Sequence, residues 1–588
     1  MSYALRWGLP YVAKYKFRLI FGFLVNVLIT LGSLINPYLA GRIVLDVIQQ
    51  ERHYLLANYL GIMVGNTVIR SIARYWFRIL YEETAQKVLY ELRRDVYHKL
   101  HMQNFTWFDK NRVGDTMSRM TGDLEAIRGF LAFDLFAIPE SILLYLSAII
   151  VMSMINLPLT LAMMVLAPVV LVAALKQGKE MRPAFRDVRE QFSRLNSVCE
   201  ENIGGNRVVK AFTKEAYEIE KFTEANQAFY DSNTKTARIR VKYMPVMESC
   251  AALLPFILLF FGSLLVIYGH VELWQIITIS GYLWMLDNPT RMFGWYVNNM
   301  QNFVTSLEKV HEMMRQRIYI ENPHSPVETE KIEGNVEFKN VGFSYDIYLP
   351  QPYVLKDISF SVKKGQTVGI VGGTGSGKTA LVNLIARFYD VQEGAVLVDG
   401  VNVKDYNITD LRRWISYAMQ DVFLYSDTVE GNIAYGVPDA TMDVIYDAAE
   451  VADADGFVRK MDEGYDTIVG ERGVGLSGGQ KQRLSLARAI ATEPAILILD
   501  DVTSAVDMET EHKIQAALAE KVIKNENNTG TSGGPTTFIV AHRLSAVKSA
   551  DLILVLENGT IIERGNHEEL LAYNGYYARL YEEQMGTK

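Results

Sequence analysis

A glycine-rich stretch from Gly372 to Thr379 reads G-x-x-x-x-G-K-T and lies between the apolar run TVGIV and a segment of helical composition. In such a loop the backbone N–H groups and the N-terminus of the following helix point at bound phosphate. The loop residues expected to line the phosphates are Gly372, Gly375, Ser376 and Gly377. Lys378 is expected to reach the β- and γ-phosphates of a nucleotide, and the Thr379 hydroxyl to bind Mg²⁺. Because strand and helix are both in place, the motif favours a nucleotide site over a glycine-rich turn without a ligand.

Two consecutive aspartates, Asp500 and Asp501, follow the apolar run ILIL. A run of branched apolar residues is typical of a buried strand in a parallel sheet, and the carboxyl ends of such strands form the edge where ligands bind. At a nucleotide site we expect Asp500 to support Mg²⁺ and Asp501 to stand next to the water that attacks the γ-phosphate. The length of the Asp501 side chain then bears directly on the rate of hydrolysis.

A second loop rich in small residues, LSGGQ, spans residues 476–480 and leads into the helical stretch KQRLSLARAI. The N-terminus of a helix is an anion-binding end, so this loop offers a second phosphate site on the same domain. Its expected contacts are Ser477, Gly478, Gly479 and Gln480. A domain with two phosphate-binding ends separated by a long insertion favours head-to-tail pairing of two such domains.

The composition of the 588-residue chain changes near Tyr319. Long apolar runs dominate before that point, and the sequence after it is typical of a soluble α/β protein. The net charge of −8 averages two different parts, and two cysteines are too few for a disulfide framework. We expect domains at residues 1–319 and 336–588, a linker at residues 320–335, and no nucleic-acid partner.

Six apolar segments of the first part are long enough, at about 20 residues each, to cross a lipid bilayer. They are expected near residues 17–35, 55–79, 131–154, 159–175, 246–266 and 273–297. The long connections after the second and fourth segments are rich in Lys and Arg, whereas the short turns after the third and fifth contain neither. By the positive-inside rule, the chain is expected to be a multi-pass protein of the cytoplasmic membrane with its soluble part in the cytoplasm.

Several ionisable residues lie within these segments, where charge is costly and usually faces a cavity or a partner. Asp287 and Arg291 are four residues apart, so an intrahelical ion pair explains them as well as a functional role does. Glu140 and Glu248 have no obvious local partner in the sequence. One hypothesis is therefore a cavity in which both acids face cationic or polar cargo.

In their order and context these motifs resemble those of the ATP-binding cassette (ABC) exporters, and the resemblance covers essentially the whole chain. It implies an all-α transmembrane domain of six helices fused to an α/β P-loop nucleotide-binding domain, the type IV ABC exporter architecture. Two such halves pair, and ATP lies between the P-loop of one cassette and the LSGGQ of the other. The implied cofactors are ATP and Mg²⁺.

The resemblance also implies roles for residues outside the P-loop. Tyr345 would stack on adenine, and His542 would touch the γ-phosphate. The residues that would hold Mg²⁺ are Thr379, Gln420 and Asp500. The stretches at residues 120–128 and 204–215 resemble coupling helices that dock on cassettes, although ordinary solvated helices would give the same pattern. Residues 524–536 are rich in Gly, Asn and Ser, which predicts a flexible surface loop.

Asp501 departs from the family's pattern, which has a Glu here that positions or deprotonates the attacking water. Asp has similar basicity but is one methylene shorter, and a carboxylate displaced by about 1 Å can cost on the order of 10²-fold in rate. With the LSGGQ intact, the chain therefore resembles the degenerate-site subunit of bacterial heterodimeric multidrug exporters, paired with a different chain that carries the catalytic Glu. The alternative is a homodimer in which both sites are slow.

The expected function is ATP-driven export of amphiphilic small molecules, with hydrolysis impaired at the chain's own site. Lipid or peptide export is the alternative within the transporter class. A mainly regulatory, ATP-sensing role in a heterodimer is the alternative outside it.

Overall fold

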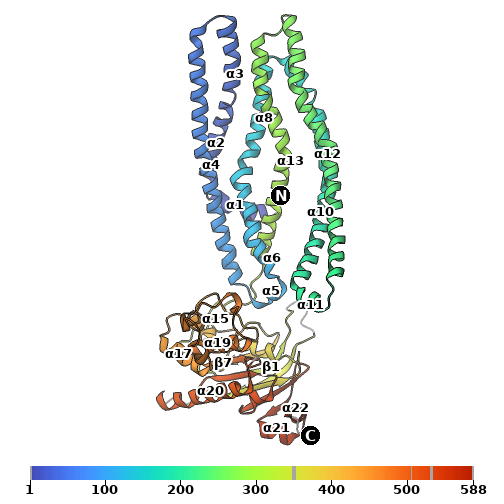
Figure 1. Ribbon diagram of the computed structural model, residues 1–588. Coiled ribbons are helices and arrows are strands. Elements are labelled where there is room, and N and C mark those ends of the chain that lie inside the picture. Colours follow the sequence, from blue (N-terminus) through green and yellow to red (C-terminus); the bar gives the residue numbers. More distant parts are fainter. Residues whose placement is uncertain (1–2, 347–351, 505, 530–533, 586–588) are drawn as a thin grey trace. The chain divides into compact units, whose positions relative to one another are not determined.

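The computed structural model describes residues 3–346, 352–504, 506–529 and 534–585, and the course of the chain is shown in Figure 1. The chain forms two compact units. The first contains Met1–His101 and Val113–Gln316, and the second contains Met102–Arg112 and Arg317–Lys588. The short segment 102–112 therefore belongs with the second unit, although the sequence on both sides of it belongs with the first.

The elements described in the first unit are all helices. The longest are α2 (Lys16–Gly32), α4 (Leu56–His101), α8 (Leu135–Ile155), α10 (Ala167–Gly204), α12 (Glu215–Ile267) and α13 (Leu273–Arg315). The shorter ones are α1 (Tyr3–Ala13), α3 (Ile35–Arg42), α6 (Val113–Ser118), α7 (Leu124–Gly129), α9 (Leu157–Met164) and α11 (Asn206–Ala211). Turns of π-helix at Ile43–Gln49, Arg119–Asp123 and Phe130–Asp134 join some of them.

Among the described residues, five helical segments of this unit are long and apolar enough to cross a membrane. They are Lys16–Gln49, His53–His101, Val113–Ile155, Leu157–Gly204 and Glu215–Ile267. The sixth predicted segment lies within α13, which is not among these five. At 46 and 53 residues, α4 and α12 are about 70 and 80 Å long, more than twice a hydrocarbon core of about 30 Å. Figure 1 shows α10 and α12 side by side as a long antiparallel pair.

The second unit is built on two sheets. A six-stranded sheet has the order β10-β9-β3-β8-β7-β6, in which β9, β3, β8, β7 and β6 are parallel and β10 is antiparallel to β9. Its strands are β3 (Thr367–Gly372), β6 (Ile415–Ala418), β7 (Ile496–Asp500), β8 (Thr536–Val540), β9 (Leu552–Glu557) and β10 (Thr560–Gly565). Because four neighbouring strands run the same way, the residues that follow β3, β8, β7 and β6 meet at one edge.

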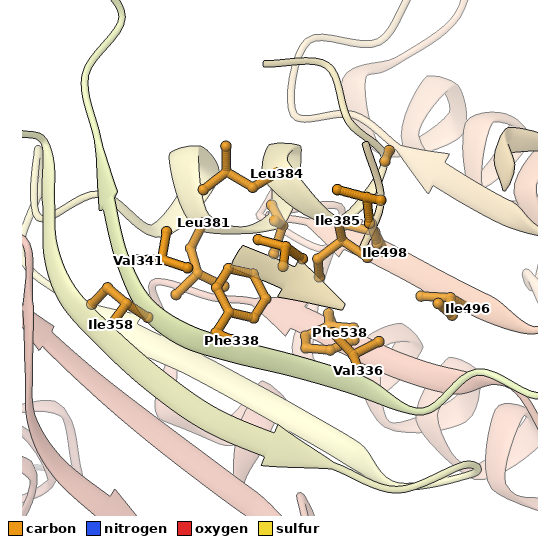
Figure 2. Close-up of a cluster of buried hydrophobic side chains, with 14 of the residues drawn as sticks. Val336, Phe338, Val341, Ile358, Leu381, Leu384, Ile385, Ile496, Ile498 and Phe538 are labelled. Carbon is orange, nitrogen blue, oxygen red and sulfur yellow. The ribbon is translucent and has the colours of Figure 1, made fainter. Parts of the chain in front are cut away.

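The second sheet is antiparallel, with the order β2-β1-β4-β5. Its strands are β1 (Val336–Phe343), β2 (Leu355–Val362), β4 (Glu393–Val398) and β5 (Val401–Asn402). The core of the unit lies between the sheets and includes α14 (Lys378–Ile385), as Figure 2 shows for Phe338, Leu381 and Phe538. All five residues of β7, four apolar residues and the terminal Asp500, are buried, which agrees with a strand covered on both faces.

The remaining helices of this unit surround the sheets. They are α5 (Phe105–Lys110), α15 (Ile408–Arg413), α16 (Val429–Ile433), α17 (Met442–Val451), α18 (Asp455–Val458), α19 (Gly478–Ala491), α20 (Met508–Thr529), α21 (His567–Tyr573) and α22 (Tyr576–Met585). The prediction of a loop at residues 524–536 is wrong in its first half, because α20 continues through Lys524 to Thr529. Asn, Lys and Glu in this stretch are polar enough for a loop but do not prevent a helix already begun from continuing. Residues 530–533 of the predicted loop lie outside the described part of the chain.

Candidate functional site

The glycine-rich loop leaves β3 at Gly372 and reaches α14 at Lys378. Gly372 has a φ of 151°, and a Cβ there would lie 2.2 Å from the carbonyl oxygen of Leu556. Gly377 caps α14 with a φ of 102°. Only glycine fits these two positions without strain or a clash, so the motif's glycines are fixed by backbone geometry.

Lys378 is buried at the start of α14, with 6% of its surface exposed. Its Nζ donates hydrogen bonds of 2.9 Å to the carbonyl oxygens of Gly372 and Gly373. Burial lowers the pKa of this amine, and the charges of Asp500 and Asp501 act in the opposite direction. Ser376 Oγ is also buried and has no hydrogen-bond partner among the described residues. A buried cation and an unpaired hydroxyl in one loop are groups that phosphate oxygens satisfy.

Asp500 ends β7 and is 2% exposed. It accepts two side-chain hydrogen bonds, from Thr379 Oγ1 to Oδ1 at 3.2 Å and from the Tyr417 hydroxyl to Oδ2 at 3.1 Å. Burial raises the pKa of this carboxyl group, and both hydrogen bonds lower it. A carboxylate beside a threonine hydroxyl is a pair of hard oxygen donors, which fits Mg²⁺ held jointly with substrate phosphates. The described residues contain no group of three His, Cys, Asp or Glu that could hold a metal by themselves.

Asp501 follows with its backbone in the left-handed region, at a φ of 51°. Its N–H donates to the carbonyl oxygen of Val540 on the neighbouring strand at 2.9 Å. Asp tolerates this conformation better than most residues. The strand partner therefore fixes where the Asp501 side chain begins, and the reach of its carboxylate depends on side-chain length.

A cavity of about 300 Å³ opens at this edge of the sheet. The sequence-predicted residues that line it are Tyr345, Gly375, Gly377, Lys378, Thr379, Gln420, Asp500, Asp501 and His542. Gln420 follows β6 and His542 follows β8, so the parallel sheet brings both to the P-loop. Gly372 and Ser376 belong to the same loop but are not among the described lining residues.

The LSGGQ loop lies elsewhere on the unit, because none of Ser477–Gln480 is among the described residues that line this cavity. Ser477 caps α19 in a capping box: its Oγ accepts from the Gln480 N–H at 3.3 Å, and Gln480 Oε1 accepts from the Ser477 N–H at 2.8 Å. This S-x-x-Q arrangement fixes the loop at the helix N-terminus. Ser477 and Gly478 are exposed and open to a partner.

Helix α5 packs next to the nucleotide cavity through aromatic contacts. Phe105 stacks on Phe388 with ring centroids 4.5 Å apart, and Tyr389 donates a 2.9 Å hydrogen bond to Asp109. The Tyr389 ring lies 5.1 Å from that of Tyr345. The first coupling helix was expected at residues 120–128, and this is wrong: those residues belong to the first unit, and segment 102–112 packs with the cassette. Docking of α11, within residues 204–215, stays a prediction.

The two acids with no obvious local partner in the sequence each have a partner on another helix. Glu140 lies 3.7 Å from Arg74, and Glu248 lies 3.6 Å from Arg291. Arg291 also forms the intrahelical pair with Asp287, at 2.8 Å. Both partners come from other helices, which is why local spacing did not reveal them.

Sequence reasoning also missed Tyr417, which contacts Asp500, the residue expected to support Mg²⁺. One signal could have found it: the strand ISYA has a tyrosine three residues before Gln420, at a position where an apolar residue would pack as well. The aromatic rings of Phe388 and Tyr417 lie 5.6 Å apart. Tyr417 is thus the end of a row of aromatic side chains that begins at Phe105.

Comparison with known proteins agrees with this geometry over the whole chain. Residues 19–289 match the ABC transporter transmembrane region, and residues 355–504 match the ABC transporter family. The chain is 36% identical over 576 residues to the ABC transporter ATP-binding protein YknU of Bacillus subtilis, covering 98% of this chain and 96% of the relative. It is 34% identical to YgaD of the same organism, which is named for multidrug export, covering 97% and 98%. A solved bacterial Atm1-family ABC exporter with ATP bound superposes with a TM-score of 0.79, at 25% identity, covering 97% of this chain and 99% of that one.

Proposed function

The chain belongs to the ABC exporters, and from this premise we propose that it is one half of a dimeric pump that exports amphiphilic small molecules across the cytoplasmic membrane. The ABC ATP-binding domain couples ATP hydrolysis to this transport. The name of the relative YgaD supports a multidrug-type cargo for the pump.

One observation carries the finer proposal. Asp501 lines the cavity at the position where the family has Glu, and its backbone is held by Val540, so it cannot move forward to make up the missing methylene. The chain's own P-loop then binds ATP, with Mg²⁺ on Thr379 and Asp500, but hydrolyses it slowly. When bound, Mg²⁺ neutralises charge developing on the phosphates.

The LSGGQ loop supports pairing with a second, different ABC half-transporter. Its cap is intact and its end is exposed, so it can complete the ATP site of a second cassette. An intact LSGGQ loop, together with a shortened carboxylate at the chain's own ATP site, favours a heterodimer in which the partner supplies the catalytic Glu. Closure of the cassettes on ATP switches access to the cargo site only through the differential affinity of ATP for the closed state.

Transport into inside-out membrane vesicles tests the exporter function. Vesicles from cells that express the native complex should accumulate a fluorescent amphiphile when ATP is added. Vesicles with Lys378→Ala in this chain should accumulate much less, because the P-loop has lost its phosphate-binding cation. Equal accumulation in both, or none with the native complex across anionic, neutral and cationic amphiphiles, would contradict the proposal.

A further inference from the structure

Helix α4 carries three arginines, Arg70, Arg74 and Arg78, within or at the edge of its membrane span. They are spaced by four residues, so they follow one side of the helix. Counted from Leu56 at about 1.5 Å per residue, Arg70 lies about 21 Å along the helix, within the length of a hydrocarbon core of about 30 Å, and Arg78 lies about 33 Å along it, at the edge of such a core. Charges at such depth are rare and usually serve a ligand or a partner.

Each guanidinium group contacts a neighbouring segment, although Arg74 and Arg78 are exposed and Arg70 is only partly buried. Arg70 Nε donates to the carbonyl oxygen of Ile29 on α2 at 3.1 Å, and Arg74 faces Glu140 on α8. Arg78 lies over the rings of Phe133 and Phe136, at 5.0 and 4.8 Å. Figure 1 shows α2 beside α4. The arginine seam, defined as Arg70, Arg74 and Arg78, thus faces the first and third spans.

The opposite face of α4 has the character of a lipid-facing surface. Its exposed side chains in this stretch are Ile62, Val64, Val68, Ile69, Ile72, Tyr75 and Trp76. The helix is therefore amphipathic in this stretch, with its cations on the side that contacts α2 and α8 and apolar side chains on the other side. This pattern excludes the simple account in which all three arginines are anchors that reach out to lipid head groups, because the deepest one is bonded to a neighbouring helix.

The seam has more positive than negative charge. Glu140 is the one carboxylate within 4.0 Å of any of its guanidinium groups among the described residues, and at 3.7 Å it makes a long ion pair with Arg74. Asp134, next to Phe133 in the sequence, instead accepts from Asn299 at 3.2 and 3.3 Å. Among the described residues, neither Arg70 nor Arg78 has a carboxylate within 4.0 Å, although the charge of Glu140 also acts on Arg70 at longer range. An anion brought to the seam would supply what these groups lack.

We propose that the arginine seam binds the anionic head group, phosphate or carboxylate, of an amphiphilic cargo. The planar guanidinium fork suits both groups, because it donates two parallel hydrogen bonds to a pair of oxygens. The apolar body of the cargo would pack on neighbouring aromatic residues such as Phe133 and Trp295, whose rings lie 5.2 Å apart. This inference rests on the proposed export function and reverses the charge of cargo that the acids alone suggested.

The test uses the native complex in proteoliposomes and two dyes that share one apolar body, one with a carboxylate and one with a quaternary ammonium. In Arg74→Gln and Arg70→Gln, uptake of the anionic dye at low concentration should fall about tenfold, since a charge-assisted hydrogen bond is lost. Uptake of the cationic dye should not fall. Arg93→Gln, an exposed arginine on the cytoplasmic extension of α4, is the matched control and should change neither. A similar fall for both dyes, or for neither, would overturn the proposal.

A second variant keeps the test decisive if the arginine variants fold poorly. Glu140→Gln removes the competing carboxylate and should strengthen anionic-dye uptake several-fold; weaker uptake would contradict the proposal. A fluorescent phosphatidic acid then tests whether the anionic head group can come from a lipid as well as from a soluble dye. If Arg74→Gln reduces the transfer of this lipid and also the uptake of the soluble anionic dye, both head groups use the seam.

Failure of the export function can be told apart from failure of the seam. If the native complex transports no dye, equilibrium binding of the two dyes to the detergent-purified complex decides the inference. Tighter binding of the anionic dye, lost in Arg74→Gln, supports the seam without transport. Equal binding of both dyes in both proteins contradicts it.

Discussion

The hydroxyl of Tyr417 donates a hydrogen bond to Asp500 Oδ2 across 3.1 Å, while Thr379 contacts the other oxygen of the same carboxylate. Asp500, which we propose supports Mg²⁺, is thus held from both sides, by the strand next to it and by the first turn after the P-loop. Through Phe388, the Tyr417 ring is also in contact with the row of aromatic side chains that reaches Phe105 on α5.

Tyr417→Phe should weaken Mg²⁺ binding at this site and leave nucleotide binding in EDTA unchanged. Loss of one hydrogen bond to a buried carboxylate costs about 1 to 2 kcal/mol, or about tenfold in Mg²⁺ affinity. That bond lowers the pKa of Asp500, so its loss raises the pKa further. As pH falls, Mg²⁺ affinity should therefore be lost at a higher pH in the variant. Titration of Mg²⁺ against a fluorescent ATP analogue at several pH values measures both effects; identical curves for the two proteins would rule out a positioning role.

Asp501→Glu should raise the ATPase rate at the chain's own site. The added methylene moves the carboxylate forward by about 1 Å, and such a displacement is worth on the order of 10²-fold at a reacting water. Single-turnover hydrolysis of ATP by the native complex measures this rate. Asp501→Asn is the control, because it keeps the length and removes the base. If the Glu variant hydrolyses no faster than the native protein, side-chain length is not what limits the site.

Ser477→Asp should lower the ATPase rate of the whole complex strongly without loss of thermal stability. Asp is as good an N-cap as Ser, so α19 stays capped, but its charge repels the phosphate of a partner's ATP. Binding of ATP to this chain's P-loop should persist. Ser477→Thr keeps a hydroxyl cap and should behave like the native protein. Normal turnover in the Asp variant would mean that the loop serves no ATP.

Phe105→Ala should reduce the amount of cargo moved per ATP more than the ATPase rate itself. The substitution removes the stacked contact of α5 with Phe388, at 4.5 Å, but leaves the nucleotide cavity intact. Phe108→Ala, on the same helix, is the control, because its ring is about half exposed and contacts Trp107 within α5. The ratio of dye uptake to phosphate release in proteoliposomes distinguishes the two. A proportional fall in both quantities would show that α5 does not transmit closure.

The architecture and most of the nucleotide cavity could be predicted from the sequence, because their signals are local. Apolar length predicts spans, and the P-loop glycines are required by the backbone at Gly372 and Gly377. The parallel sheet then brings the residues that follow its strands, such as Gln420 and His542, to one edge.

Contacts between segments far apart in the sequence could not be predicted. The pair of Arg74 with Glu140 joins residues 66 positions apart, and the contact of Phe105 with Phe388 joins two distant segments. The first coupling helix was misplaced because amphipathic helical composition is the same at residues 120–128 as in any solvated helix. The arginine seam was not predicted, because its residues lie within an apolar run and their partners are on other helices.

We propose above that this chain contributes the slow site of a heterodimer. The intact mass of the complex, purified in mild detergent from its native membrane by a tag on this chain, tests that proposal. We expect two different half-transporter chains in equal amounts, the second with Glu in the position of Asp501. A single species of twice this chain's mass would contradict it, and Asp501 would then be the hydrolytic carboxylate of a slow symmetric pump.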